Sequence, residues 1–166
     1  VIELENLAGR ITLSGAAASD QISVEGVVKA GGDSQEEAES LADSLELTFD
    51  ESNRRLVVSA LYPVDDHDVY FFPGERVVSG MAHIFGGSKT TMKYQGQRVT
   101  VVNRPTSGSV MLAVDITLGL PAGVNAEIDN GVGRIEVEGV HAGLILNSKS
   151  GDISVAAGVG DLGVDD

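Results

Sequence analysis

The sequence contains no cysteine and no tryptophan, and only 4% of its residues are aromatic. The absence of cysteine excludes disulfide bonds, thiolate metal ligands and thiol nucleophiles, although it does not identify a cellular compartment. No window approaches the roughly 20 apolar residues that a membrane helix needs, and no basic and apolar leader stands at the start. We therefore expect no direct membrane insertion in this segment.

Basic residues are also scarce, because 11 Lys and Arg oppose 25 Asp and Glu, giving a formal net charge of −14. Such a chain repels phosphate backbones and anionic membrane surfaces at neutral pH, so we expect no nucleic acid partner. Four bases do lie close together in the sequence: Lys89, Lys93, Arg98 and Arg104. They form either one positive stripe or a solvated strand face, and we favour the second interpretation.

The chain has 166 residues, 42% of them hydrophobic, which is enough for one continuous core. We therefore expect a single domain over residues 1–166. The 21 glycines, with few aromatic residues, favour many short strands joined by tight turns over a helical bundle.

The last forty residues repeat at an interval of 18. A repeat this short holds only a few strands and turns, so successive copies must stack to bury a core. Within each copy, apolar and polar residues alternate, as in a strand with one buried face. The sequence therefore predicts an all-β fold, specifically a β-solenoid or β-helix. The equivalent residues are Ile128, Leu146 and Val164; Ile135 and Ile153; Val137 and Val155; Leu144 and Leu162; and Gly133 and Gly151.

Glycine and asparagine mark the expected corners. Asn130-Gly131 and Ser150-Gly151 tolerate positive φ, which predicts that the chain turns there. Asp129, Asn147 and Asp165 share one phase of the repeat, so we expect them above one another. They are either polar residues facing water or a pair of acids with a small cation between them.

A copy of the same motif opens the chain. Leu4-Glu5-Asn6 followed by residues 9–15 matches Ile128-Asp129-Asn130 followed by residues 133–139, position for position. We therefore expect the opening strands to form another turn of the same structure.

A helix is expected near residues 34–45, after a strand over residues 21–28. Ser34 and Glu37 have the spacing of a capping box, and apolar residues follow at helical intervals. Alternating residues 45–49 and 56–61 then predict a hairpin around a polar turn. We expect the helix to lie across one side or end of the sheet and to cover apolar surface.

Residues 63–104 are the least regular part of the sequence. Asp65, Asp66 and Asp68 form an acidic turn, which we interpret as solvated, with a calcium site as the alternative because carboxylate oxygens suit that ion. The string from Gly86 to Thr91 lacks the spacing of a phosphate-binding loop and predicts a flexible turn.

The three histidines, His67, His83 and His141, are scattered, and no pair has metal-binding spacing. No nucleophile elbow is present either. We therefore expect no catalytic residue, no cofactor and no metal site, and we do not expect an enzyme.

Residues 114–124, 130–135, 147–148 and 150–153 resemble the adhesin-like family of β-helical cell-envelope domains, a family of unknown function in bacterial and archaeal surface proteins. The helix followed by the strand over residues 56–61 is similar to the family's usual order of elements, so the resemblance covers most of the chain. Residues 63–104 depart from the family pattern, being longer and more basic. The resemblance implies an extracellular or envelope location and supplies no catalytic residues.

Val164-Asp165-Asp166 begins another copy of the repeat and breaks off. We expect either a fragment of a longer protein or an open end covered by a neighbouring subunit. The leading hypothesis is a non-catalytic surface or envelope module with an adhesin-like structural or interaction role and a protein or surface partner. The alternative is a self-assembling subunit of a surface filament or layer, joined by strand addition at open β-edges.

Overall fold

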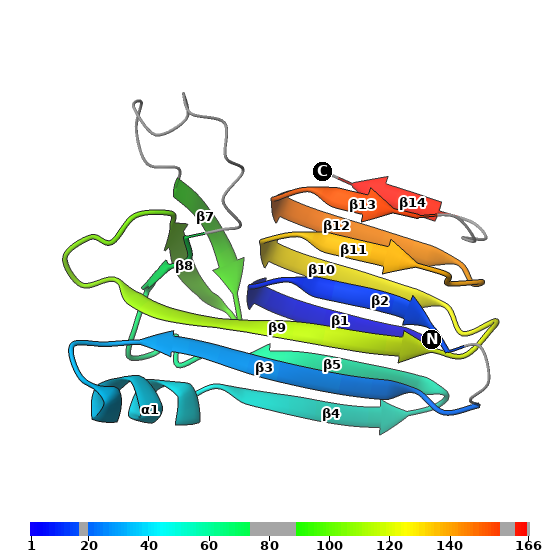
Figure 1. The fold of residues 1–166 in the computed structure, drawn as a ribbon, viewed down its shortest axis with the longest axis horizontal. Helices are drawn as coiled ribbons and strands as arrows, with labels where there is room; N and C mark the ends of the chain where they lie inside the picture. Colours follow the sequence, from blue (N-terminus) through cyan, green and yellow to red (C-terminus); the bar gives the residue numbers. More distant parts are fainter. Residues whose placement is uncertain (17–19, 74–88, 157–161, 166) are drawn as a thin grey trace.

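The computed structural model describes residues 1–16, 20–73, 89–156 and 162–165, which form strands and one short helix, α1 (Gln35–Asp43) (Figure 1). The strands lie in two mixed sheets. Sheet A has the order β14-β12-β10-β1-β5-β4, and sheet B has the order β13-β11-β2-β9-β6-β8-β7, with β3 also paired to β9. Sheet A contains β1 (Ile2–Ala8), β4 (Glu46–Ser52), β5 (Arg55–Leu61), β10 (Ala126–Val132), β12 (Leu144–Ser150) and β14 (Leu162–Asp165). Sheet B contains β2 (Ile11–Gly15), β3 (Ser23–Gly31), β6 (Val69–Phe71), β7 (Lys89–Tyr94), β8 (Gln97–Val102), β9 (Val110–Leu120), β11 (Ile135–Glu138) and β13 (Ile153–Val155).

The expected all-β fold is confirmed, and the interval of 18 residues is the register of the parallel strands. Ile128 pairs with Leu146, and Leu146 pairs with Val164. The opening motif continues this column, because Leu4 pairs with Ile128. Leu4, Ile128 and Leu146 are fully buried, whereas Val164, on the last described strand, is 51% exposed.

The sheets as wholes are mixed, so the described residues do not form the uniform coil that the word solenoid implies. Strands β3, β4 and β7 pair antiparallel with their neighbours. The 18-residue pattern does not run through these segments, and short turns connect two of them to the next strand. Asn53 and Arg54 have positive φ in the β4-β5 turn, as Gln95 and Gly96 do in the β7-β8 turn.

The order of strands in the stack differs from their order in the chain. Strand β9 pairs with β2, but β10, which follows β9 directly, pairs with β1. The chain therefore passes over the level that β1 and β2 occupy, and the opening motif lies inside the stack rather than at its end. Figure 1 shows these first strands between β9 and β10.

Three tyrosines pack against one another in the core. Tyr62 contacts Tyr70 and Tyr94 edge to face, with ring centroids 5.4 and 5.8 Å apart. All three are buried, and burial raises the pKa of each hydroxyl. They therefore stay neutral at physiological pH. Tyr62 and Tyr94 act through packing and hydrogen bonds, whereas the buried Tyr70 hydroxyl has no partner among the described residues.

The expected helix is present, shortened by a few residues. The Ser34 hydroxyl accepts a hydrogen bond from the Glu37 N–H at 3.1 Å, which is the expected cap. The Glu37 carboxylate, however, accepts from the N–H of Asp33 instead of Ser34. The helix packs against β3, although none of its residues is buried.

Candidate functional site

Glycine corners join the strands of sheet A to those of sheet B. Gly9, Gly133 and Gly151 have φ of 132°, 129° and 143°, and they lie above one another. A Cβ on Gly133 would lie 2.1 Å from the carbonyl oxygen of Gly9, and a Cβ on Gly151 would lie equally close to that of Gly133. Only glycine fits this column, so the residue that follows each glycine is held in a fixed place.

The sequence prediction of the corners was wrong by two residues at one of them. Asn130 and Gly131 lie inside β10, and the positive φ belongs to Gly133. The alternation explains the error, because Asn130 is two residues after the buried Ile128 and points to the same inner face. At the other predicted corner, Gly151 does have positive φ.

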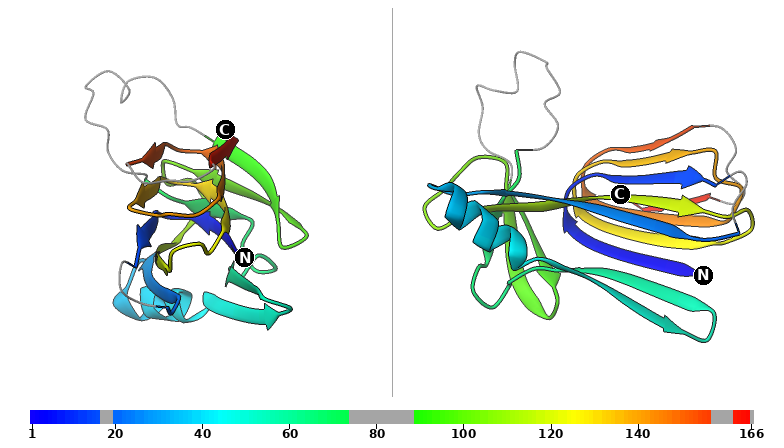
Figure 2. Two further views of the ribbon diagram at one scale, coloured as in Figure 1. Left: turned by 90° about the vertical axis from the view of Figure 1, so that its right-hand side faces the viewer. Right: turned by 60° about the horizontal axis from the view of Figure 1, so that its bottom comes forward.

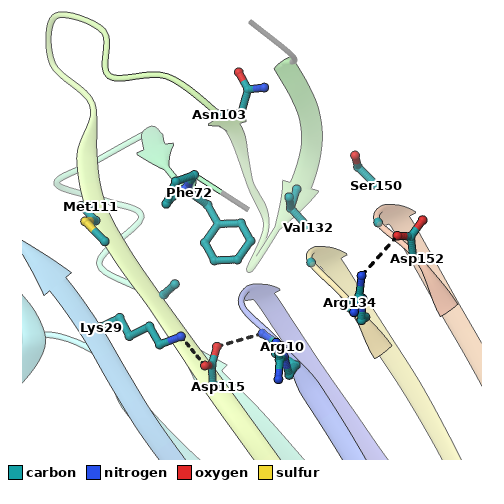
Figure 3. A pocket seen from close by; sticks show the side chains of 14 residues that line it. Arg10, Lys29, Phe72, Asn103, Met111, Asp115, Val132, Arg134, Ser150 and Asp152 are labelled. Carbon is teal, nitrogen blue, oxygen red and sulfur yellow. Dashed lines mark hydrogen bonds and ion pairs between the residues drawn. The ribbon is translucent and has the colours of Figure 1, made fainter. Parts of the chain in front are cut away.

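A column of charged residues follows the glycines. The strand register places Asp115, Arg10, Arg134 and Asp152 in successive positions, each directly before a paired isoleucine. Neighbouring strands lie about 4.8 Å apart, so these side chains emerge close together. Figure 3 shows them along one wall of a groove.

The charges in this column pair with one another. The Asp115 carboxylate accepts a hydrogen bond from the Arg10 N–H at 2.9 Å and forms an ion pair with Lys29. Arg134 lies 3.4 Å from Glu136 and 3.7 Å from Asp152, and Arg10 lies 3.8 Å from Glu136. The side chains of these ion pairs are partly exposed, and exposed ion pairs are weak, so a ligand with a carboxylate or hydroxyl group can compete for the guanidinium groups.

Apolar side chains line much of the rest of the groove. Phe72, Met111 and Val132 line a volume of about 330 Å³ together with the charged column (Figure 3). Guanidinium groups donate several hydrogen bonds in one plane, and an aromatic ring offers a flat contact surface. The arrangement therefore suits binding of a small polar group with an apolar body, such as a sugar ring or a peptide side chain.

A second column, of buried polar side chains, lies inside the same corners. Asn6, Asn130 and Ser148 are paired in register and at most 5% exposed. The Asn6 amide donates to Asn130 Oδ1 at 3.2 Å, and the Asn130 amide donates to the Gly9 carbonyl at 3.0 Å. The Ser148 hydroxyl has no partner among the described residues. Sequence reasoning missed this column because it assigned Asn130 to a corner of the chain.

The Tyr62 hydroxyl connects this column to the aromatic cluster. It donates to the Ala8 carbonyl at 2.9 Å and lies 3.2 Å from Asn6 Oδ1. The buried amides therefore fix the corners from within, and the charged groove lies on the outside of the same corners.

The column of Asp129, Asn147 and Asp165 is in register as predicted. The Asn147 amide donates a hydrogen bond to the Asp129 carboxylate at 2.8 Å, so these two side chains contact each other directly. Glu5 lies next in this row, and burial together with the negative charge of Asp129 raises its pKa.

The other candidate residues do not converge on one site. His67 and His141 lie in separate loops, and His83 and residues 86–88 lie outside the described residues. Asp65 accepts a hydrogen bond from the Gln97 amide at 3.2 Å, and among the described residues no group of three or more His, Asp or Glu could hold a metal ion. Of the four clustered bases, which we interpreted as a solvated strand face, Lys93 and Arg98 pair directly across β7 and β8, and both are exposed.

Comparison of the chain with protein-family models, with curated proteins and with solved structures finds no match. In the described ranges, no helix is long and apolar enough to cross a membrane.

Proposed function

We propose that the chain is a non-catalytic interaction module of a cell surface or envelope, adhesin-like in kind, in which a β-solenoid-like stack presents the charged groove to a surface partner. The groove on the glycine corners is the observation that carries this proposal. The acids and bases of the groove are paired with one another. A catalytic acid or base must instead be held near the reacting atom of a substrate, so the pairing favours a binding role over catalysis. The resemblance to envelope domains and the acidity of the chain support an exposed location.

The location is tested by protease treatment of intact cells of the source organism, followed by detection of this chain with an antibody. We expect the chain to be degraded while a cytosolic marker survives. A chain that is protected until the cells are lysed, and that fractionates with cytosolic proteins, would refute the surface location.

The role of the groove is tested with beads that carry the purified chain and are mixed with envelope fragments of the same organism. We expect the double variant Arg10→Ala and Arg134→Ala to bind at least about tenfold less than the original chain, because both bases line the groove. The matched control, Lys93→Ala and Arg98→Ala, also removes two positive charges, but from the exposed face of β7 and β8. Equal binding by the two double variants would contradict the proposal.

A second candidate function is a self-assembling structural subunit. It is favoured by β13 and β14, which each have a neighbour on one side only among the described strands. An unpaired strand edge recruits further strands. Light scattering on the purified chain over a wide concentration range separates the two candidates, because a strict monomer without filaments removes the second one.

A further inference from the structure

The end of the stack formed by β3 and β4 is open. Among the described strands, β3 pairs only with β9, and β4 pairs only with β5. Each therefore presents one free edge of backbone N–H and C=O groups. Figure 2 turns this end toward the viewer and shows α1 lying over one part of it.

The inner faces of these two edge strands are apolar and partly exposed. On β4, Phe49 pairs with the fully buried Val58 but is itself 57% exposed. On β3, Val28 pairs with the fully buried Val114 but is 36% exposed. The core therefore continues to this end of the stack and meets solvent there.

The negative charge of the molecule is concentrated at the same end. Residues 20–55, which comprise β3, α1, β4 and the turn into β5, contain ten acids and three bases, a net charge of −7 out of −14 for the whole chain. Of the three bases, Lys29 is paired with Asp115 and Arg55 is paired with Glu3, while Arg54 lies in the β4-β5 turn. The ten acids are Asp20, Glu25, Asp33, Glu36, Glu37, Glu39, Asp43, Glu46, Asp50 and Glu51.

We propose that this end binds an extended, basic segment of another protein, which adds as a strand to the free edge of β4. Strand addition satisfies the exposed backbone groups of the edge. Residues of β4 alternate, so Leu47 and Phe49 face inward while Glu46 and Asp50 face outward. A segment in which apolar residues alternate with Lys or Arg would place its apolar side chains beside Phe49 and its charges beside the two acids.

Charge decides between this occupant and a second copy of the chain. A second copy also carries −14, and its own docking end carries −7, so two such ends repel each other and self-pairing here is unfavourable at low salt. The proposal does not depend on the groove, because none of the four β4 residues lines it.

The experiment measures the fluorescence anisotropy of labelled ten-residue peptides titrated with the purified chain. The probe alternates Val and Lys; a second peptide alternates Val and Glu, and a third has the charge of the first but two Pro residues that prevent strand pairing. We expect only the first to bind, and salt to weaken it. Equal binding of the Glu peptide, equal binding of the Pro peptide, or no binding of the Lys peptide would overturn the proposal.

Variants of the chain locate the site. We expect Phe49→Ser, and separately Glu46→Gln with Asp50→Asn, each to weaken binding of the Lys peptide roughly tenfold. Glu127→Gln with Glu138→Gln removes the same charge from the middle of the stack and is expected to leave binding unchanged. Circular dichroism confirms that each variant is folded. Equal effects of the two charge variants, or a dimer of the original chain that Phe49→Ser dissociates, would refute the assignment.

Discussion

Replacing Gly133 by alanine is the sharpest test of the close-packed corners. The new Cβ would lie 2.1 Å from the Gly9 carbonyl oxygen, where ordinary contact needs at least 3.4 Å, so the two corners must separate by about 1 Å. Separation weakens two hydrogen bonds, from Gly9 N–H to the Val132 carbonyl and from Gly133 N–H to the Ser150 carbonyl. Each bond contributes about 1 kcal/mol, and the positive φ costs a residue with Cβ about 1–2 kcal/mol more.

The expected loss is therefore about 3–4 kcal/mol in the free energy of unfolding, or about 10 °C in Tm for a chain of this size. Gly123→Ala is the matched control, because Gly123 also has positive φ, at 80°, but no atom lies within 4 Å of its added Cβ. It should lose only about 1 kcal/mol. Urea unfolding followed by circular dichroism measures both. If the two variants lose equal amounts of unfolding free energy, the close approach of the corners is not what requires glycine at position 133.

Three further predictions address the core, the buried polar column and the pH dependence. Leu146→Ala should destabilise the fold by about 2–5 kcal/mol, whereas Ile145→Ala, at a side chain 49% exposed, should cost well under half as much in the same urea experiment. Asn130→Ala should lower the free energy of unfolding by about 1–3 kcal/mol, because it leaves buried polar groups unpaired. Ser148→Ala should be neutral or stabilising, since the Ser148 hydroxyl has no partner among the described residues, and thermal melts compare the two variants. The pKa of Glu5 is raised in the fold, so its protonated form is favoured and its contribution to stability is lost as pH rises through that pKa. Glu5→Gln should therefore gain stability over the original chain at pH 7 and show no gain below the ordinary glutamate pKa of about 4.3, and melts across pH that show the opposite trend would contradict this sign.

The alternation and the 18-residue interval were sufficient to predict the strands of the repeat, their register and that the opening motif forms another turn of the same structure. A parallel neighbour in register must present like side chains at like positions, so identical spacing in the sequence translates directly into pairing. The same alternation also predicts that Asn130 faces the core, because it lies two residues after the buried Ile128. The preference of asparagine for turns misled the interpretation, because the Asn130 amide is satisfied here inside the fold, by the Gly9 carbonyl and the Asn6 side chain.

The groove could not be predicted in this way. Arg10 and Arg134 repeat in the sequence, but Asp115 and Lys29 join them only through the pairing of β9 with β2 and β3. The apolar part of the groove comes from Phe72 and Met111, in the segments that lack the repeat. No spacing links these segments, so only their packing brings them together.

The sequence by itself determined the strand-rich character, the register of the repeat and the acidity of the β3 to β4 segment, because these depend on local periodicity and composition. The tertiary structure decided the order of strands, the antiparallel additions, the groove and the open acidic end. Alternation specifies which face of a strand is buried, but it does not specify which distant strand becomes its neighbour. That choice depends on how all the apolar faces are buried together, and here it places β2 between β9 and β11, which begin only at Val110 and Ile135.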